Sequence, residues 1–570
     1  MLLVLLWCAT HHYQGLGGDA ELYAVQAWAR IHPNLFHDLY LQNTSQDSYS
    51  VFSSFYAACI GLIGLRNAAL GLMIVFKAGF FAAAWLLARR LASGPCAFLA
   101  VAVLIVTAGG YGAFGVFHTA EDWLTARTPA EALVLAALAC GFYGSRLFAG
   151  LLACAALFVH PLMALPGLML LICLGLPWRL SAAGAAAGIL LALGIALGAQ
   201  REPLIARFFP LMDADWLEVV RERSQFLFLE YWRAADWSLN VRPFLSLCLA
   251  ALAIDDARVR KFSAAAMLVG AAGLAVALVA GLGPVSLLLQ GQAWRWVWVT
   301  GFASVLLLPA TVLSLWRSAT VGKLCSLLMI SAWTFSTIGG AAWLACAVVL
   351  WLMRDRINAP AERILRGVAV RSGVITETIG GWIRRIRSAL SSPLVAVMLV
   401  AACMICVPRA LRDLVTDGTA AQIDELSDWR GAIPPNANVF VVPAHNSAAF
   451  AWFTLERPSY LTVDQSSGVV FARATALEVR RRSQVLLPLM DPDWRLLSKM
   501  QAARSGSKTS ASLRPLTREE LISVCADPQL NFVVAREELG FQPLRHIHPG
   551  IWQDWNLYDC RRVTSPTPAA

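Results

Sequence analysis

The chain has 570 residues, of which 58% are hydrophobic and only 14% are charged, and its formal net charge is +10. Soluble globular domains are nearer half apolar and a quarter charged, so the composition argues against a soluble protein. The basic residues are mostly arginines in short stretches between apolar runs, which is typical of membrane topology signals and not of a nucleic-acid-binding patch. We therefore expect membrane lipids, and no nucleic acid, among the partners.

Long apolar runs recur from the start of the chain to about residue 409. A run of roughly 18 apolar residues crosses the hydrocarbon core as a helix, and these runs lack the alternation of barrel strands. The sequence predicts thirteen spans, at residues 1–16, 66–88, 94–117, 128–145, 147–160, 161–177, 180–198, 242–254, 262–283, 295–316, 323–337, 339–353 and 391–409. The first is short and does not look like a signal peptide, because it lacks a basic start and a small-residue cleavage site. It is either a true first helix or the end of a longer one.

The arginines between the spans indicate the orientation, because cytoplasmic loops carry an excess of basic residues. With a cytoplasmic N-terminus, every basic loop falls on the cytoplasmic side, including a basic amphipathic segment at 354–390. This arrangement requires residues 51–65 to form a juxtamembrane helix. The other side then receives a first outer loop at 17–65, the shorter loops 118–127, 199–241 and 284–294, and residues 410–570.

Residues 410–570 are less apolar and read as a soluble domain. Strand-like runs at 438–443, 531–535 and 555–560 alternate with helical stretches at 474–487 and 517–525, which predicts a small α/β domain. Cys525 and Cys560 lie in this domain, outside the apolar runs. If the domain faces an oxidising compartment, we expect them to form a disulfide, and the alternative is two unpaired thiols. The predicted fold is thus an all-α polytopic membrane bundle of about 11–13 transmembrane helices (1–409) with a C-terminal soluble α/β domain.

Polar residues that could carry chemistry gather on the predicted outer face, where charged groups near the bilayer are functional candidates. They are Asp19 and Glu21 after the first span, His118, Glu121 and Asp122 after the third, His160 before Pro161, and Arg295 at the start of the tenth. Each has a structural alternative: a solvated helix start or an N-cap for Asp19, solvated loop charge for Glu121 and Asp122, a kink with a satisfied imidazole for His160, and an interfacial anchor for Arg295.

A carboxylate and an arginine at an outer membrane surface suit the transfer of a sugar from a lipid phosphate. The carboxylate acts as general base on an acceptor hydroxyl, and the guanidinium pairs with the phosphate leaving group. No cofactor is required for this chemistry. The acidic residues have an alternative use, which is to bind a divalent cation, Mg²⁺ or Mn²⁺, through carboxylate oxygens.

With these residues the chain resembles the C-type (GT-C) polytopic membrane glycosyltransferases, which use polyprenyl-phosphate sugars. Asp19-Ala20-Glu21-Leu22-Tyr23 looks like the acidic motif of the family's first outer loop, and Glu121-Asp122 resembles the acidic pair of its second. The stretches 160–161, 292–295 and 429–437 are similar to segments of bacterial members. The resemblance implies that Asp19, with Glu21, is catalytic, that Glu121, Asp122 and His118 contact the acceptor or a metal, and that Arg295 binds the donor phosphate.

The predicted function is therefore transfer of a sugar from a lipid-linked donor to an envelope acceptor. The alternatives are another envelope polysaccharide or lipid enzyme, a non-catalytic membrane assembly protein, and a transporter of an envelope precursor, which predicts inverted repeats that are not evident here. The richness in arginine, alanine and leucine suggests a GC-rich bacterial genome. That would place the chain in a bacterial inner membrane, with the C-terminal domain in the periplasm.

Overall fold

The computed structural model describes residues 2–11, 13, 15–43, 46–92, 94–107, 109–335, 339–357, 427–442, 447–486, 516–547 and 555–565. Within these ranges the chain is mostly helical and carries two small sheets. The predicted span 391–409, most of the basic segment 354–390 and the domain boundary at residue 410 lie outside the described residues.

Each predicted span up to residue 353 overlaps a described helix, but the span predicted at 94–117 is wrong in its second half, where the helix ends at Val106 and residues 110–118 form a short hairpin. Its first half contains α1 (Leu2–Thr10), α2 (Asp19–Trp28), α3 (Phe52–Ile63), α4 (Leu65–Leu91), α5 (Gly94–Val106), α6 (Arg127–Phe142), α7 (Arg146–Val159), α8 (Pro161–Gly175) and α9 (Trp178–Gly198). Its second half contains α10 (Pro203–Phe208), α11 (Ala214–Arg223), α12 (Ala234–Ala253), α13 (Ala257–Leu282), α14 (Ser286–Gln290), α15 (Val297–Arg317), α16 (Thr320–Thr334) and α17 (Gly340–Leu352).

Four of the described helices are long and apolar enough to cross a membrane: Leu65–Leu91, Trp178–Gly198, Ala257–Leu282 and the continuous stretch Ser286–Arg317. Six apolar helices, α3, α5, α7, α8, α16 and α17, are shorter. Only 17% of the apolar window of α9 is buried inside the structure. Large side chains such as Leu147, Phe158 and Leu190 are more than half exposed. Contiguous apolar surface of this kind is expected where a helix faces lipid.

A short hairpin connects α5 to α6 and rests on α12. Its strands β1 (Gly110–Tyr111) and β2 (Phe117–His118) pair antiparallel. Asn240 binds both backbone groups of Gly112, with its side-chain oxygen 2.9 Å from the nitrogen and its side-chain nitrogen 2.6 Å from the carbonyl oxygen. Gly112 has a φ of +75°, and a Cβ there would lie 2.2 Å from the ring of Trp294. Only glycine therefore fits at this turn.

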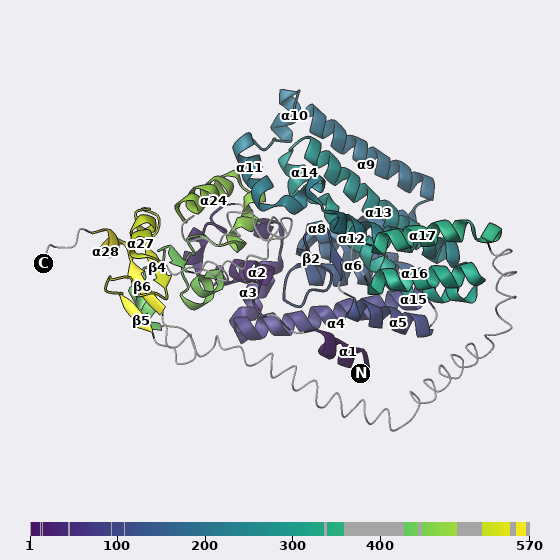
Figure 1. The fold of residues 1–570 in the computed structure, drawn as a ribbon, viewed down its shortest axis with the longest axis horizontal. Helices are drawn as coiled ribbons and strands as arrows, with labels where there is room; N and C mark the ends of the chain where they lie inside the picture. Colours follow the sequence, from purple (N-terminus) through teal and green to yellow (C-terminus); the bar gives the residue numbers. More distant parts are fainter. Residues whose placement is uncertain are drawn as a thin grey trace, which may run out of the picture.

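The C-terminal domain contains a four-stranded sheet in the order β3-β4-β6-β5 (Figure 1). Its strands are β3 (Val439–Val441), β4 (Phe532–Ala535), β5 (Arg545–Ile547) and β6 (Trp555–Asp559), with β3 parallel to β4 and the other pairs antiparallel. Its helices are α22 (Ser427–Ala432), α23 (Ser447–Ala449), α24 (Arg473–Leu486), α27 (Arg518–Cys525) and α28 (Cys560–Thr564). Strands β3, β4 and β6 lie within runs predicted from the sequence, whereas β5 was not predicted.

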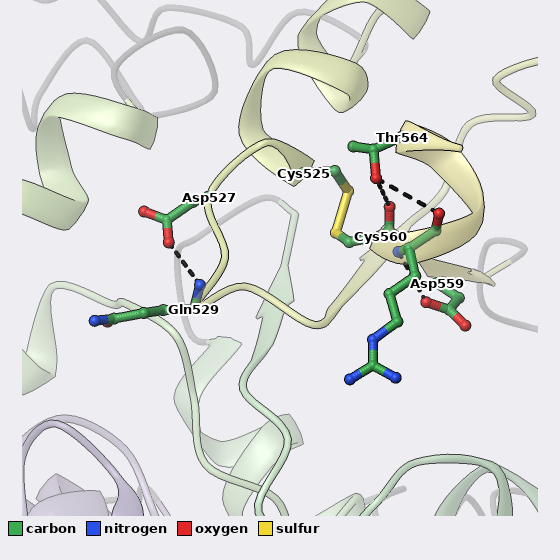
Figure 2. The surroundings of a disulfide bond; sticks show 7 residues. Cys525, Asp527, Gln529, Asp559, Cys560 and Thr564 are labelled. Atoms are coloured by element: carbon green, nitrogen blue, oxygen red, sulfur yellow. Dashed lines mark hydrogen bonds between the residues drawn. A yellow bond between two sulfur atoms is a disulfide. The ribbon is translucent and has the colours of Figure 1, made fainter. Parts of the chain in front are cut away.

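A disulfide joins Cys525, the last residue of α27, to Cys560, the first residue of α28 (Figure 2). This is the pair expected from the sequence. The neighbouring turns are fixed by short hydrogen bonds, from Thr564 Oγ1 to the Cys560 carbonyl at 2.9 Å and from the Gln529 N–H to Asp527 at 2.8 Å. The bond therefore ties the helix before β4 to the helix after β6.

The C-terminal domain packs against the helical part through the segment around α24. In Figure 1, α24 lies between α11 and the helices next to the sheet. The Trp216 indole on α11 donates to the Val469 carbonyl at 2.8 Å, and the Gln290 amide donates to the Val470 carbonyl at 3.1 Å. Asn34 of the first outer loop donates to the Glu456 carbonyl at 2.7 Å. The domain is thus fixed over the same end of the helices that carries α2.

Candidate functional site

The centre of the candidate site is a guanidinium held between two carboxylates. Arg127, the first residue of α6, donates through Nη1 to Asp19 Oδ2 at 2.7 Å. It also binds both oxygens of Glu121, with Nη2 at 2.7 Å and Nε at 3.0 Å. The Arg127 and Glu121 side chains are 3% and 2% exposed, whereas that of Asp19 is 33% exposed. Asp19 is therefore the member of the cluster that a substrate can reach.

Asp19 is the first residue of α2, and its side chain does not act as the helix N-cap. That position belongs to Gly18, which has a φ of +58° and makes no side-chain cap. The Asp19 side chain is therefore not the N-cap of α2, although it lies at a partly exposed helix start. Instead, the start of α2 directs the Asp19 carboxylate towards Arg127, which is 108 residues away in the chain.

Arg295 lies beside the same aromatic ring as Arg127. Its Cζ lies 4.2 Å from the centre of the Phe117 ring, and the Cζ of Arg127 lies 5.0 Å from that centre. Arg295 is 6% exposed, so it is a buried group and not a surface anchor. Its Nε donates to Gln292 Oε1 at 2.8 Å, and no carboxylate among the described residues lies within ion-pair distance. The sequence-predicted Asp19, Glu121 and Arg295 thus meet in one place.

The backbone around the cluster is strained at two positions. Gln292 and Ala120 both adopt a positive φ, 43° and 51°, which costs a residue with a Cβ on the order of 1 kcal/mol. Each strained residue makes a hydrogen bond near the cluster. Gln292 accepts from Arg295, and the N–H of Ala120 donates to Glu131 at 2.9 Å. Strain maintained by surrounding contacts is a feature of functional sites.

Tyr23 completes the inner wall of the cluster. Its ring centre lies 6.0 Å from the Cζ of Arg127, and the side chain is buried. Burial raises the pKa of Tyr23 to about 12, and the negative charges of Asp19 and Glu121 add to this, while Arg127 and Arg295 oppose it. The phenol is therefore neutral and available as a hydrogen-bond donor at physiological pH.

Glu21, the second acid of the motif, is not part of this cluster. It is 4% exposed, and its Oε2 has no hydrogen-bond partner among the described residues. Its pKa is raised to about 8, first by burial and then by the negative charge of Asp464, while a backbone hydrogen bond from Ala449 opposes the rise. Both neighbours belong to the C-terminal domain. Glu21 therefore lies at the contact between α2 and that domain.

This environment makes the domain contact sensitive to pH. Glu21 binds a proton more tightly in the folded chain than at its ordinary pKa of 4.5, so its contribution to stability falls as pH rises from about 4.5 to about 8. We expect the thermal midpoint of the wild-type chain to fall more over pH 5.5–8.5 than that of Glu21→Gln. The exposed Glu519→Gln variant should follow the wild type. Parallel wild-type and Glu21→Gln profiles, measured by scanning fluorimetry in detergent, would contradict the assignment.

His118 and Asp122 line a second space next to the cluster. It is a cavity of about 350 Å³ between the end of α1, the end of α5 and residues 118–123. Asp122 forms an ion pair with Lys77 of α4, whose Nζ also lies 5.3 Å from the Trp7 ring centre. Glu121 also lines this cavity. The cavity therefore connects His118 and Asp122 with the buried cluster.

His160 has a structural role that the geometry makes plain. It is the N-cap of α8, where Nδ1 accepts from the N–H of Met163 at 3.3 Å, and Pro161 begins the helix. The imidazole is buried and lies within electrostatic range of Arg295 and Arg127. The break between helices predicted at His160-Pro161 is thus present, next to the guanidiniums of Arg127 and Arg295.

The acidic residues do not fit a shared divalent cation. Both Glu121 oxygens bind Arg127, and one also accepts from Thr125 at 2.8 Å. Asp122 pairs with Lys77 instead. Among the described residues no group of three histidine, cysteine or acidic side chains is placed to hold a metal. We therefore derive no step that passes through a metal ion.

Arg127 is the residue that sequence reasoning missed. It was counted only as the end of an outer loop, although it forms the only direct link between Asp19 and Glu121 among the described residues. An arginine six residues after a glutamate has no recognisable spacing, and Arg127 is one of several arginines on the predicted outer side, so no feature of the sequence distinguishes it. Comparisons with protein-family models, curated proteins and solved structures found no match to this chain.

Proposed function

We propose that this chain is a membrane glycosyltransferase of the GT-C type that transfers a sugar from a polyprenyl-phosphate donor to an envelope acceptor. In this proposal the helical part crosses a bacterial inner membrane about 11–13 times, and the cluster and the C-terminal domain face the periplasm. The observation that carries it is the meeting of a partly exposed carboxylate, Asp19, with a buried and carboxylate-free guanidinium, Arg295, at one end of the helices.

The two groups divide the chemistry of transfer between them. Asp19 takes the proton of the acceptor hydroxyl, while the acceptor oxygen forms a bond to the anomeric carbon of the sugar. The bond between that carbon and the phosphate oxygen breaks, and the lipid phosphate leaves with the electron pair. Arg295 stabilises the charge that develops on this phosphate. Arg127 is a positioning residue. Its Nη1 holds Asp19, and Glu121 fixes the orientation of the Arg127 guanidinium.

The burial of the two arginines supports this division. A guanidinium in a dry site interacts with a phosphate much more strongly than one in water. Arg127 is neutralised by its two carboxylates, but Arg295 has only the neutral Gln292 as a hydrogen-bond partner among the described residues. An anionic ligand is the partner that would balance its charge.

The test is Asp19→Asn, which keeps the shape of the side chain and removes the base. We expect transfer to fall by about 10²–10⁴-fold, the usual contribution of general base catalysis. The readout is the surface glycan of a host that lacks its own copy of this chain, with membrane levels checked by blotting. A purified sample supplied with a decaprenyl-phosphate hexose provides a second readout, the release of decaprenyl phosphate.

The matched control is Asp47→Asn. Asp47 also pairs with an arginine of the first outer loop, Arg30, at 2.8 Å, but it lies outside the cluster. We expect Asp47→Asn to retain wild-type transfer. Wild-type glycan output from Asp19→Asn at equal membrane level would reject the catalytic role and favour a non-catalytic assembly protein.

A further inference from the structure

We propose that a basic cavity at the end of the helices opposite the Asp19–Arg295 cluster binds the phosphate headgroup of an anionic phospholipid. The cavity has a volume of about 520 Å³ and lies between the ends of α4, α12 and α15 and the starts of α5 and α13. This volume is within the range of about 300–1,000 Å³ that small-molecule sites occupy. The inference concerns binding alone and does not depend on glycosyl transfer.

Four arginines line this basic cavity, together with one acid, Asp256. Arg258 pairs with Asp256 at 2.7 Å. Within the described ranges, the other three, Arg89, Arg90 and Arg317, take part in no ion pair. The cavity therefore carries positive charge that its own carboxylate does not balance. A cleft lined by one sign of charge concentrates ligands of the opposite sign, so its ligand is expected to be an anion.

Arg90 has hydrogen-bonding capacity that the protein does not use. Its Cζ lies 3.7 Å from the centre of the Tyr143 ring. Its Nε is buried and has no hydrogen-bond partner among the described residues. An aromatic ring contacts the flat face of a guanidinium, whereas the N–H donors lie along its edge. The Tyr143 ring thus orients Arg90 and leaves that edge for the planar, two-point contact that a guanidinium makes with phosphate.

The surroundings of the basic cavity favour a lipid over a free anion. Apolar side chains, among them Leu313, form part of its wall. Tyr143, which stacks on Arg90, is 43% exposed, and Trp316, which precedes Arg317, is 41% exposed. Partly exposed aromatic residues beside arginines at helix ends are typical of the level of lipid headgroups. Basic pockets between membrane helices at this level bind anionic headgroups.

The basic cavity is far from the site proposed for the sugar donor. Arg295 and Arg317 lie near opposite ends of the continuous helical stretch Ser286–Arg317, roughly 30 Å apart along its axis. Among the described residues, the basic cavity shares no lining residue with the cavity beside the Asp19–Arg295 cluster. In the proposed orientation it lies at the cytoplasmic leaflet. Lipid binding here is therefore separable from donor binding at Arg295.

A lipid-binding experiment on the full chain tests the site. The chain is purified in dodecyl maltoside, which carries no phosphate, and native mass spectrometry measures the apparent Kd for dioleoyl phosphatidylglycerol. We expect this Kd to rise by about 10–100-fold in the double variant Arg90→Gln/Arg317→Gln, because charge-assisted hydrogen bonds to the phosphate are lost. The matched control is Arg179→Gln, which should bind like the wild type, since Arg179 is an exposed arginine at the start of α9 outside the cavity.

A second control separates the basic cavity from the cluster. Arg295→Gln removes the guanidinium proposed for the donor phosphate and should leave the Kd for phosphatidylglycerol unchanged. Weaker binding of phosphatidylglycerol by Arg295→Gln would place this lipid at the cluster and overturn the proposal. Because the probe carries no sugar and no prenyl chain, its binding does not report on glycosyl transfer.

Two comparisons on the wild-type chain identify the ligand without a variant that must fold. Dioleoylglycerol, which has the same acyl chains and no phosphate, should bind at least about 10-fold more weakly. Inorganic phosphate in excess should not displace the lipid. Equal affinity for dioleoylglycerol, wild-type binding by the double variant, or displacement by inorganic phosphate would each overturn the proposal, the last by showing a free-anion site.

Discussion

Replacing Arg127 with methionine is expected to lower the free energy of unfolding by about 3–5 kcal/mol, the usual cost of leaving buried charges without a partner. Arg127 is the residue that neutralises Glu121, whose side chain is 2% exposed and whose two oxygens both bind it. Methionine fills a similar volume but donates no hydrogen bond. Denaturant unfolding in detergent, followed by tryptophan fluorescence, measures the loss.

Two further variants separate charge from packing in this prediction. Arg30→Met removes an arginine that pairs with Asp47 at 2.8 Å but is 37% exposed, so its loss should cost less than about 1 kcal/mol. Adding Glu121→Leu to Arg127→Met removes the orphaned carboxylate and should recover much of the stability, because apolar replacement of a buried ion pair is often neutral. If Arg127→Met alone unfolds like the wild type, the cluster is not the buried ion pair described here.

The long apolar helices could be predicted from the sequence because their signal is local. Each apolar run is long relative to its flanks, so α4, α9 and α13 coincide with runs identified by composition. The strands β4 and β6 carry the same kind of signal, a short apolar run between polar turns. Strand β5 (Arg545–Ile547) lacks it, because its short edge sequence is mostly basic and is stabilised only by pairing with β6.

The candidate site was predictable in part. Charge and span order predict that Asp19, Glu121 and Arg295 lie on the same side of the helices, which is why these three residues are grouped from the sequence. The sequence prediction grouped Glu21 with Asp19, but the structure separates them, because residues two apart on a helix do not face the same way. The pairing of Arg127 with Asp19 could not be predicted, because it joins residues 108 positions apart and leaves no pattern in either segment.

The contacts of Asp38 are even harder to predict from the sequence. Replacing Asp38 is the second substitution for which we expect a large effect. Its carboxylate is completely buried, and Oδ2 accepts from the Trp452 indole at 2.7 Å and the Ser459 N–H at 2.8 Å. Oδ1 accepts from the Tyr40 N–H at 2.8 Å and the Gln465 amide at 2.9 Å. Three of these donors belong to the C-terminal domain. One aspartate of the first outer loop therefore fixes the domain to the helical part.

We expect Asp38→Asn to destabilise this contact by about 2–6 kcal/mol. The amide that replaces one oxygen is a donor, so two buried donors lose their acceptor, at about 1–3 kcal/mol each. Hydrogen exchange should then become faster in residues 450–470, while α13 keeps its protection because Asp38 makes no hydrogen bond to it. The control is Glu520→Gln, which alters the capping box of α27 and should leave residues 450–470 protected. Unchanged exchange in Asp38→Asn would show that the apolar contacts of Trp452 and Leu35 hold the domain without the carboxylate, because these side chains are buried in the same cluster.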